Sequence, residues 1–316
     1  MQVGIIGINH KSSSLALREK LARLFQAEFG PKDGVLLSTC NRTELYFSGG
    51  PLAERHSAIL DRLKGVGLHA LYSYFGPDCF NHLSRVISGI DSAIFGESDI
   101  QRQVKLAYEN ARQKEKLSHE LHYLFQKGLK IGKEMRSSFL LSKKGALLPH
   151  AIHSIVEWQG RTLENSRCLF VGNSSINRKL ISYFHYKGAR DLTLCTRTEG
   201  NVFHVVTTGW EVLERWDDFD VVVCGTYHDG YVLEKKEGAK ETLLFDLSVP
   251  RNIDPALANH PRLKLYNIDQ IGVMAQKNRG EKEIALCETV IEKAVARQMQ
   301  LFKKRKQAKW FYAVSC

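Results

Sequence analysis

The segment LLSTCNRTELY (residues 36–46) places Cys40 at the end of a short apolar run and directly before a polar turn. A cysteine in an apolar run is usually a small core residue. A cysteine that leaves a strand into a polar turn, two residues from Arg42, can instead ionise and act as a thiolate nucleophile. Taken alone, the segment fits both roles, and the core role is the more common one.

A second segment with chemical potential, CLFVGNSSINRK (168–179), has the pattern of a strand, a turn and the start of a helix. Dinucleotide-binding proteins carry GxGxxG at this point, but here only the first glycine is present. Hydroxyl and amide side chains and the N-terminus of a helix still favour a phosphate. On the motif alone, one alternative therefore stays open: the domain has a dinucleotide-binding fold but binds its nucleotide poorly or not at all. The turn positions are Gly172, Asn173, Ser174, Ser175, Ile176 and Asn177.

The end of the next apolar run, LTLCTRT (192–198), bears on the choice of cofactor. NAD-binding proteins usually place Asp or Glu there, where the carboxylate binds the ribose hydroxyls. This chain has Arg197 at that point. Because an arginine favours a 2′-phosphate, the sequence predicts NADPH as the cofactor rather than NADH.

The elements that must position Cys40 lie in the first part of the chain. Three serines, 12 to 14, supply cap candidates for a helix whose leucines repeat at helical spacing. Two short strands flank the Cys40 turn, which predicts an α/β domain over residues 1–145. Its predicted strands are 3–10, 34–40 and 44–49, and its predicted helices are 15–25, 78–117 (broken near Gly89 and Gly96) and about 120–139.

The remainder of the chain has a different pattern. A connector with Gly145 and Pro149 precedes five short apolar runs that alternate with helical or loop segments. Such runs are typical of a parallel sheet covered on both faces, so residues 146–275 are predicted to form a doubly wound, Rossmann-type NADP-binding domain. Residues 276–316 contain a stretch, 281–309, without Gly or Pro, which predicts one long C-terminal helix with a narrow apolar stripe.

Composition narrows the class of protein. Hydrophobic residues make up 43% of the 316, and no apolar run approaches the roughly 20 residues of a membrane helix. The first residues lack the features of a secretory signal. The seven cysteines are odd in number and show no CxxC spacing, which favours thiols in a reducing cytoplasm and predicts no metal site.

The charge is strongly basic and clustered. The chain carries 45 Lys and Arg against 34 Asp and Glu, a net charge of +11. Residues 102–144 hold eleven basic and four acidic residues, and the segment KKRKQAK (303–309) adds five more basic residues. A polyanionic partner such as nucleic acid is therefore plausible. Charge alone barely favours this interpretation over a soluble basic protein that has no such partner.

Taken together, these segments resemble the glutamyl-tRNA reductase family over nearly the whole chain. Cys-Asn-Arg-Thr-Glu, followed at this separation by Ser-Gly-Ile-Asp-Ser and Gly-Glu, is highly specific. The resemblance implies reduction of glutamyl-tRNA by NADPH to glutamate-1-semialdehyde, the first step of five-carbon tetrapyrrole synthesis. The matching stretches are GINHKSSSLALREKLA (7–22), LSTCNRTELY (37–46), HLSRVISGIDSAIFGESDIQRQVKLAYENA (82–111) and LLFDLSVPRNIDP (243–255) with LYNID (265–269).

The resemblance also implies roles for individual residues. Cys40 would attack the ester that links glutamate to its tRNA and form a thioester, and Arg42 would pair with a substrate carboxylate and favour the thiolate. His82 would polarise the ester carbonyl or protonate the departing ribose oxygen. The other residues aligned with the substrate pocket are Thr39, Asn41, Ser92, Glu97, Ser98, Asp99 and Gln103.

The chain departs from the family pattern in two places. The family usually shows GEPQILGQVK where this chain has GESDIQRQVK, so Asp99 adds a negative charge near the pocket. The long helix is not followed by the usual dimerisation domain, which leaves a homodimer open. The resemblance adds glutamate-1-semialdehyde aminomutase as a partner. Two alternatives remain: a tRNA-binding or regulatory protein on a decayed reductase scaffold, and an aldehyde dehydrogenase that acts on small acyl groups.

Overall fold

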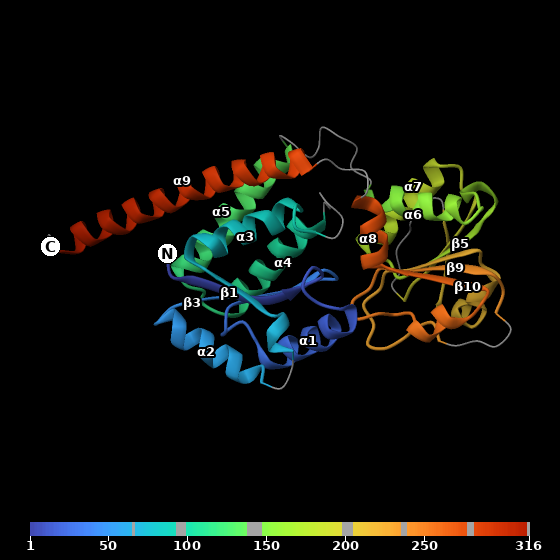
Figure 1. The fold of residues 1–316 in the computed structure, drawn as a ribbon, viewed down its shortest axis with the longest axis horizontal. Helices are drawn as coiled ribbons and strands as arrows, with labels where there is room; N and C mark the ends of the chain where they lie inside the picture. The colour runs from blue at the N-terminus through green and yellow to red at the C-terminus, as the bar shows by residue number, and fades with distance from the viewer. Residues whose placement is uncertain are drawn as a thin grey trace. The chain divides into compact units, whose positions relative to one another are not determined.

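The computed structural model describes two compact units, each with its own sheet (Figure 1). The first combines Met1–Gly145 with Asn278–Cys316, and the second is Ala146–Lys277. The long C-terminal helix therefore belongs to the first unit and is not a separate region. The residues described are 1–64, 67–92, 99–137, 147–197, 205–234, 239–276 and 281–314.

The sheet of the first unit is antiparallel and has the strand order β2-β3-β1-β4. All seven residues of β1 and all seven of β3 are buried, because helices cover both faces of these central strands. One face packs on α1 and α2, and the other packs on α3, α4 and α5. The strands are β1 (Val3–Asn9), β2 (Val35–Ser38), β3 (Arg42–Ser48) and β4 (Tyr72–Phe75).

The helices of the first unit begin and end at residues suited to those positions. Ser14 caps α1, since its side chain accepts a hydrogen bond from the backbone of Leu17, and Ser118 caps α5 in the same way. Gly89 ends α3 with a φ of 76°, a left-handed conformation that glycine adopts without strain. The helices are α1 (Leu15–Glu28), α2 (Leu52–Arg62), α3 (Gly76–Ser88), α4 (Asp99–Lys114), α5 (His119–Met135) and α9 (Glu281–Val314), with a 3₁₀ turn at Leu68–Ala70.

Helix α9 packs on α3 and α5 along an apolar stripe (Figure 1). The residues of the stripe recur every three or four positions, which keeps them on one side of a helix. They join the same core as the buried side chains of α3, α4 and α5. The members of the stripe are Cys287, Ile291, Val295, Met299 and Phe302.

The second unit holds a six-stranded sheet in which every pair is parallel. Its order, β10-β9-β8-β5-β6-β7, is that of doubly wound dinucleotide-binding domains, with the order reversing between β5 and β8. Ligands of such sheets bind at the carboxyl ends of the strands, at this switch point. The strands are β5 (Arg167–Val171), β6 (Asp191–Cys195), β7 (Val206–Thr208), β8 (Val221–Cys224), β9 (Thr242–Asp246) and β10 (Leu263–Asn267).

Helices α6 (Leu147–Trp158), α7 (Ser175–Tyr186) and α8 (Ile268–Gln276) complete this unit, with 3₁₀ segments at Leu163–Asn165, Trp210–Asp218 and Pro255–Asn259. The fold class predicted from the sequence is confirmed, including the long C-terminal helix. Two short strands, β4 and β7, were not predicted. In the described part of the chain, no helix combines the length and the apolar character needed to cross a membrane.

Candidate active site

Cys40 lies in the tight turn that joins β2 to β3. The backbone N–H of Thr39 donates to the carbonyl oxygen of Arg42 (2.8 Å), which closes the turn. The Thr39 hydroxyl oxygen accepts from the N–H groups of Asn41 and Arg42, both at 3.2 Å. The predicted hydrogen bond from Thr39 to the substrate is untested, but its hydroxyl helps to build the turn that presents Cys40.

Cys40 differs from the other described cysteines in its surroundings. It is half-buried, whereas the other five are buried in cores. Burial raises the pKa of the Cys195 thiol to about 12 and raises the pKa of Cys79, Cys168 and Cys224 as well. Since a thiol must ionise to attack a carbonyl, Cys40 is the described cysteine best placed to be a nucleophile.

Arg42 and Glu44 lie two residues apart on β3, so their side chains point to the same face of the sheet. Both are fully buried, and Nη1 of Arg42 lies 2.8 Å from Oε1 of Glu44. The guanidinium also donates to the backbone oxygen of Asp91 and lies 3.4 Å from its carboxylate, which Lys11 contacts from the solvent side. The predicted contact between Arg42 and a substrate carboxylate stays a prediction, because the described contacts of its terminal nitrogens are within the fold.

Glu44 is the centre of this buried cluster. It accepts hydrogen bonds from Arg42 (2.8 Å), Tyr46 (2.6 Å), Tyr72 (2.5 Å) and His82 (2.8 Å). Burial acts to raise the pKa of the Glu44 carboxyl, but His82 and Arg42 outweigh it and hold that pKa well below its usual range. Burial raises the pKa of Tyr46 and of Tyr72, and the Glu44 carboxylate raises both pKa values further. Glu44 is therefore an ionised acceptor that all four donors share.

His82, from α3, is oriented by Glu44 and by two aromatic rings. Its Nε2 lies 2.8 Å from the ionised Glu44 carboxylate, which assigns the proton to Nε2. No hydrogen bond joins Nδ1 to a described residue. The ring centroids of Tyr72 and Tyr74 lie 5.3 and 5.0 Å from that of the imidazole. This arrangement leaves Nδ1 as the atom that can accept or deliver a proton.

The remaining predicted substrate residues fall into three groups. Asn41 and Ser92 are buried, and Oδ1 of Asn41 has no hydrogen-bond partner among the described residues. Glu97 and Ser98 lie outside the described residues. Asp99 is buried at the start of α4. Its carboxylate accepts hydrogen bonds from Nε and Nη2 of Arg102, at 2.9 and 3.0 Å, and from Nε2 of Gln103, at 3.1 Å. The added charge of Asp99 is therefore paired with Arg102.

The predicted phosphate turn lies at the carboxyl end of β5. Gly172 has a φ of 96°, and a Cβ there would lie 2.5 Å from the Cβ of Thr226. A larger residue at Gly172 would therefore disturb the fold before it met any ligand. Ser174 caps α7 by accepting from the N–H of Asn177 (3.2 Å), and the buried Asn177 amide donates to the carbonyls of Val171 and Gly172.

The first backbone N–H groups of any α-helix have no acceptor within the helix, and at the start of α7 the Ser174 hydroxyl accepts from one of them, that of Asn177. They fit a pyrophosphate, because they supply donors and the positive end of the helix dipole. Asn177 holds the turn from inside, whereas Asn173, Ser174, Ser175 and Ile176 are half-exposed. The turn therefore keeps its tight form without the second and third glycines of the usual motif, and its binding of a phosphate stays a prediction.

Arg197 follows β6 and is exposed. Its guanidinium carbon lies 4.6 Å from the centroid of the Trp210 ring, which lies 5.1 Å from the ring of His228. Stacking uses the face of the guanidinium and leaves its N–H groups at the edge for an anion. This geometry fits the 2′-phosphate of NADPH.

Sequence reasoning did not identify several residues of these sites. The motif contains Glu44 but gives no sign that it is buried and shared by four donors. Asp91 and Lys11 were quoted only as parts of matching stretches, and Tyr72 and Trp210 lie outside the quoted motifs. An arginine and a glutamate two residues apart in a strand indicate an ion pair, but this signal fits a surface pair as well as a buried one.

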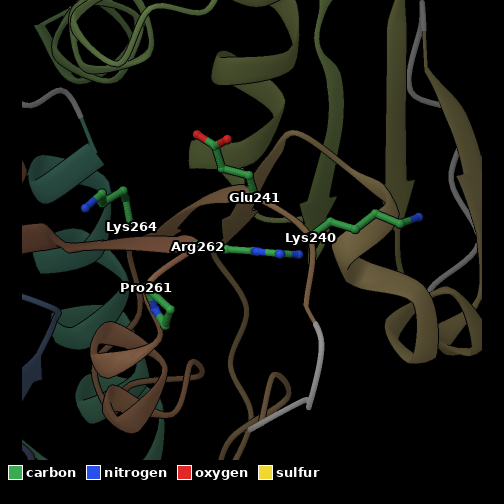
Figure 2. Close-up of a pocket in the computed structure, with 5 residues that line it drawn as sticks. All are labelled: Lys240, Glu241, Pro261, Arg262 and Lys264. Atoms are coloured by element: carbon green, nitrogen blue, oxygen red, sulfur yellow. The ribbon is translucent and has the colours of Figure 1, made fainter.

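The second unit also has a pocket of about 360 Å³ at the amino ends of strands β9 and β10 (Figure 2). Its residues precede or begin β9 and β10, whereas Gly172 follows the carboxyl end of β5. It is therefore separate from the phosphate turn. The pocket is lined by Lys240, Glu241, Pro261, Arg262 and Lys264.

Comparison with known proteins finds one family model for each of the two units. The family model "Glutamyl-tRNAGlu reductase, N-terminal domain" matches residues 6–139, and the model "Shikimate / quinate 5-dehydrogenase" matches residues 154–274. A glutamyl-tRNA reductase from Chlamydia abortus is 32% identical over 294 residues, which cover 88% of this chain and 86% of the relative. The chain belongs to the glutamyl-tRNA reductase family.

Two further members extend the comparison over almost the full length. A glutamyl-tRNA reductase from Akkermansia muciniphila is 27% identical and covers 94% of this chain and 97% of its own. The solved structure of glutamyl-tRNA reductase from Methanopyrus kandleri matches 98% of this chain and 82% of its own, with a TM-score of 0.53 and 24% identity, and so supports the fold. Members of the glutamyl-tRNA reductase family are oxidoreductases of tetrapyrrole synthesis, and the Rossmann-type domain indicates a nicotinamide dinucleotide as cofactor.

Proposed function

We propose that this chain reduces glutamyl-tRNA to glutamate-1-semialdehyde with NADPH through a thioester on Cys40. The observation that carries the proposal is the position of Cys40. It is the described cysteine that is not buried, and it lies in the turn that leads directly to the buried cluster of Arg42, Glu44 and His82. In a member of this family, such an arrangement supports acyl capture by a thiolate.

In the first half-reaction the Cys40 thiolate attacks the carbonyl carbon of the glutamyl ester. A C–S bond forms, the C–O bond to the terminal ribose breaks, and the ribose oxygen takes up a proton. His82 is the group we assign to that transfer: its Nδ1 takes up the proton that the Cys40 thiol loses and passes it to the ribose oxygen, while Nε2 stays bound to Glu44. Glu44 is a positioning residue here, because it acts through His82.

NADPH, when bound, supplies the hydride that converts the thioester to the aldehyde and releases the Cys40 thiolate. The amides at the start of α7 would hold its pyrophosphate, and Gly172 lets the strand turn tightly beneath them. Arg197, stacked on Trp210, would bind the 2′-phosphate and select NADPH over NADH.

The partners and the compartment complete the proposal. The net charge of +11 fits a polyanionic substrate, and the absence of disulfides among the six described cysteines fits a reducing cytoplasm. An aminomutase that accepts the reactive semialdehyde and a second copy of this chain are partners that follow from the family resemblance. Native mass spectrometry, alone and with the aminomutase, would test both.

The decisive experiment follows glutamate release and semialdehyde formation from glutamyl-tRNA, with and without NADPH. We expect semialdehyde only with NADPH, and slow release of glutamate without it, because water hydrolyses the thioester. Cys40→Ser should abolish both products, since an alcohol without a strong adjacent base is a far weaker nucleophile. Cys287→Ala, which removes a buried thiol from α9, is the control and should retain both.

Wild-type turnover in the Cys40→Ser variant would rule out the thioester route. A protein that binds glutamyl-tRNA but neither binds NADPH nor consumes the ester would instead be a regulatory protein on the same scaffold. Turnover of a small glutamyl thioester at the rate seen with charged tRNA would favour the aldehyde dehydrogenase alternative.

A further inference from the structure

Four consecutive basic residues follow Phe302, the last residue of α9 that the structure describes as buried. Phe302 is 3% exposed, whereas Lys303, Lys304, Arg305 and Lys306 are all exposed. None of the four forms an ion pair with a described carboxylate. Because a helix turns once every 3.6 residues, four successive side chains point around the whole circumference of the helix. This segment is therefore a ring of unpaired positive charge rather than a stripe.

Contacts within the first unit fix where this ring lies. The Phe302 ring lies 4.9 Å from that of Tyr123 and 5.6 Å from that of His119, both at the start of α5. Ser118, the cap of α5, lies 2.6 Å from the hydroxyl of Ser48, the last residue of β3. Residues 303–306 therefore lie near the end of the sheet where β3 ends.

The same end of the sheet holds the start of β1. Burial lowers the pKa of the Met1 amine, and Lys306 and Lys303 lie near enough to lower it further, against the opposing effect of Glu120. Figure 1 shows the N-terminus on the same side of the first unit as the C-terminal part of α9. The start of β1 is paired with the end of β3, since Val3 lies opposite Ser48.

More basic side chains come from the connection between α4 and α5. Lys114 and Lys116 are exposed and precede Ser118, and Nζ of Lys127 lies 5.7 Å from the centroid of the Tyr123 ring. Glu115 and Glu120 equal Lys114 and Lys116 in number, so the excess of positive charge at this end comes from residues 303–306 and Lys127. We call this surface the basic end and define it as Lys114, Lys116, Lys127, Lys303, Lys304, Arg305 and Lys306.

The basic end and Cys40 lie at opposite ends of the same strand. Strand β3 runs from Arg42, next to the Cys40 turn, to Ser48, next to the cap of α5. Seven residues of strand span about 20 Å at about 3.3 Å per residue. A polyanion that reaches both places must therefore extend well beyond the single nucleotide that carries the reacting ester.

We propose that the basic end binds the phosphate backbone of the RNA substrate at a distance from its aminoacylated end. The proposal rests on the proposed function for the identity of the RNA, but it assigns a surface that the chemistry at Cys40 does not require. Phosphate contacts of this kind supply affinity and position the RNA, whereas they do not read its sequence.

A membrane surface fits the basic end less well than RNA does. A helix that lies on a membrane needs an apolar face beside its charges. Among the described side chains next to these charges, Phe302 is buried against α5 and Leu301 has 39% of its surface exposed. Charges that point in all directions around the helix suit a polyanion that wraps around it or passes along it better than they suit a flat membrane surface.

The test compares two sets of three substitutions in the full chain. One variant carries Lys303→Gln, Lys304→Gln and Lys306→Gln, in which glutamine preserves helix propensity. The control carries Lys20→Gln, Arg23→Gln and Lys32→Gln, three exposed positions in or near α1 on the other face of the sheet. Binding of uncharged tRNA is measured between about 50 and 200 mM salt, a range over which phosphate contacts lose most of their strength.

We expect the α9 variant to bind tRNA at least about tenfold more weakly at the lowest salt. The slope of log affinity against log salt should fall by about 0.7–0.9 for each lost phosphate contact. The KM for glutamyl-tRNA should rise while kcat changes little, because Cys40 and His82 are untouched. The control should bind like wild type.

Equal tRNA affinity and salt slope in the two variants would overturn the proposal. So would binding to phosphatidylserine vesicles that the α9 variant loses while it retains tRNA. The binding readout is independent of turnover. If wild type makes no semialdehyde, the proposed function fails, yet the tRNA titration still decides whether the basic end binds RNA.

Discussion

The two candidate sites are built from different parts of the chain. In the first unit, side chains make the site: Arg42, Glu44 and His82 form a buried cluster with distances of 2.8 Å on either side of the central carboxylate. In the second unit, the candidate phosphate site is a turn of backbone: the side chains of Ser174 and Asn177 hold the turn through hydrogen bonds with its backbone groups.

This difference predicts that the second motif tolerates substitutions better than the first. A backbone cradle needs a tight turn and a helix start, and Ser174 or Asn177 can supply its support in place of glycines. A buried charge cluster needs each member, because the loss of one leaves the others desolvated without a partner. Substitutions should therefore have large effects in the first site and small effects in the second.

The largest effect is expected at Glu44. Glu44→Ala should lower the free energy of unfolding by about 3–5 kcal/mol, because it leaves the buried Arg42 charge without its closest carboxylate. Glu44→Gln retains the shape and should fold, but thioester formation should slow by about 10²–10⁴-fold, the usual contribution of a proton-transfer group. Chemical denaturation and glutamate release without NADPH measure the two effects.

Tyr46→Phe is the matched control for Glu44→Gln, since it removes one hydrogen bond to the same carboxylate without contacting His82. It should cost about 0.5–1.5 kcal/mol of stability and leave the pH profile of thioester formation in place. Glu44→Gln should displace that profile, because His82 loses its ionised partner. Identical profiles in both variants would show that Glu44 is structural and does not position His82.

The next effect concerns acid. Glu44 and Asp91 both have a folded pKa below the ordinary value, Asp91 because Arg42 and Lys11 outweigh its burial. Their contribution to stability is therefore complete above the unfolded carboxylate values of about 4 and is lost as pH falls below them. We expect the first unit to unfold on acidification and Glu44→Gln to show a shallower loss of stability between about pH 5 and 2. Hydrogen exchange resolved by unit would measure it, and equal acid sensitivity in wild type and variant would contradict it.

The sequence indicated the fold and the Cys40 turn better than it indicated the contacts of the buried cluster, for a physical reason. The motif around Cys40 and the strand pattern of the second unit identify the fold and a candidate nucleophile, because spacing determines which residues share a face. Burial is not readable from one strand. Arg42 and Glu44 fit a surface pair and a buried pair equally well until α3 is placed above them. Asp91 joins the cluster only through the turn that ends α3 at Gly89, a long-range contact with no local signal.

The same limit applies to the second unit. Arg197 could be predicted from its place after β6, but its stacking on Trp210 depends on a segment that follows β7, a strand too short to show in the pattern. The loss of glycines from the phosphate turn weakened the motif, and the cap by Ser174 and the anchor by Asn177 that replace them depend on their three-dimensional contacts.

A moderate effect is expected at Arg197, the main side-chain contribution to the second site. Arg197→Asp should shift the preference from NADPH toward NADH, because a carboxylate repels a 2′-phosphate and accepts from a ribose hydroxyl. The ratio of kcat/KM for the two cofactors should change by about 10–100-fold, the equivalent of one or two charge-assisted hydrogen bonds. Trp210→Phe keeps an aromatic face and should retain the preference. An unchanged ratio in Arg197→Asp would show that another group binds the phosphate.

The smallest effect is expected at Ser174, and it tests the backbone nature of the second site most directly. Ser174→Ala removes the cap of α7 and should lower the free energy of unfolding by about 1 kcal/mol, whereas Ser174→Gly should cost only a few tenths. If the amides of α7 hold the pyrophosphate, both variants should bind NADPH within a few-fold of wild type, because neither removes a backbone donor. Fluorescence titration of NADPH and thermal unfolding measure the two quantities separately. A tenfold or greater loss of NADPH affinity in both variants, with the stabilities as expected, would mean that the Ser174 hydroxyl itself binds the cofactor. The second site would then depend on a side chain as the first does, and the contrast between the two units would fail.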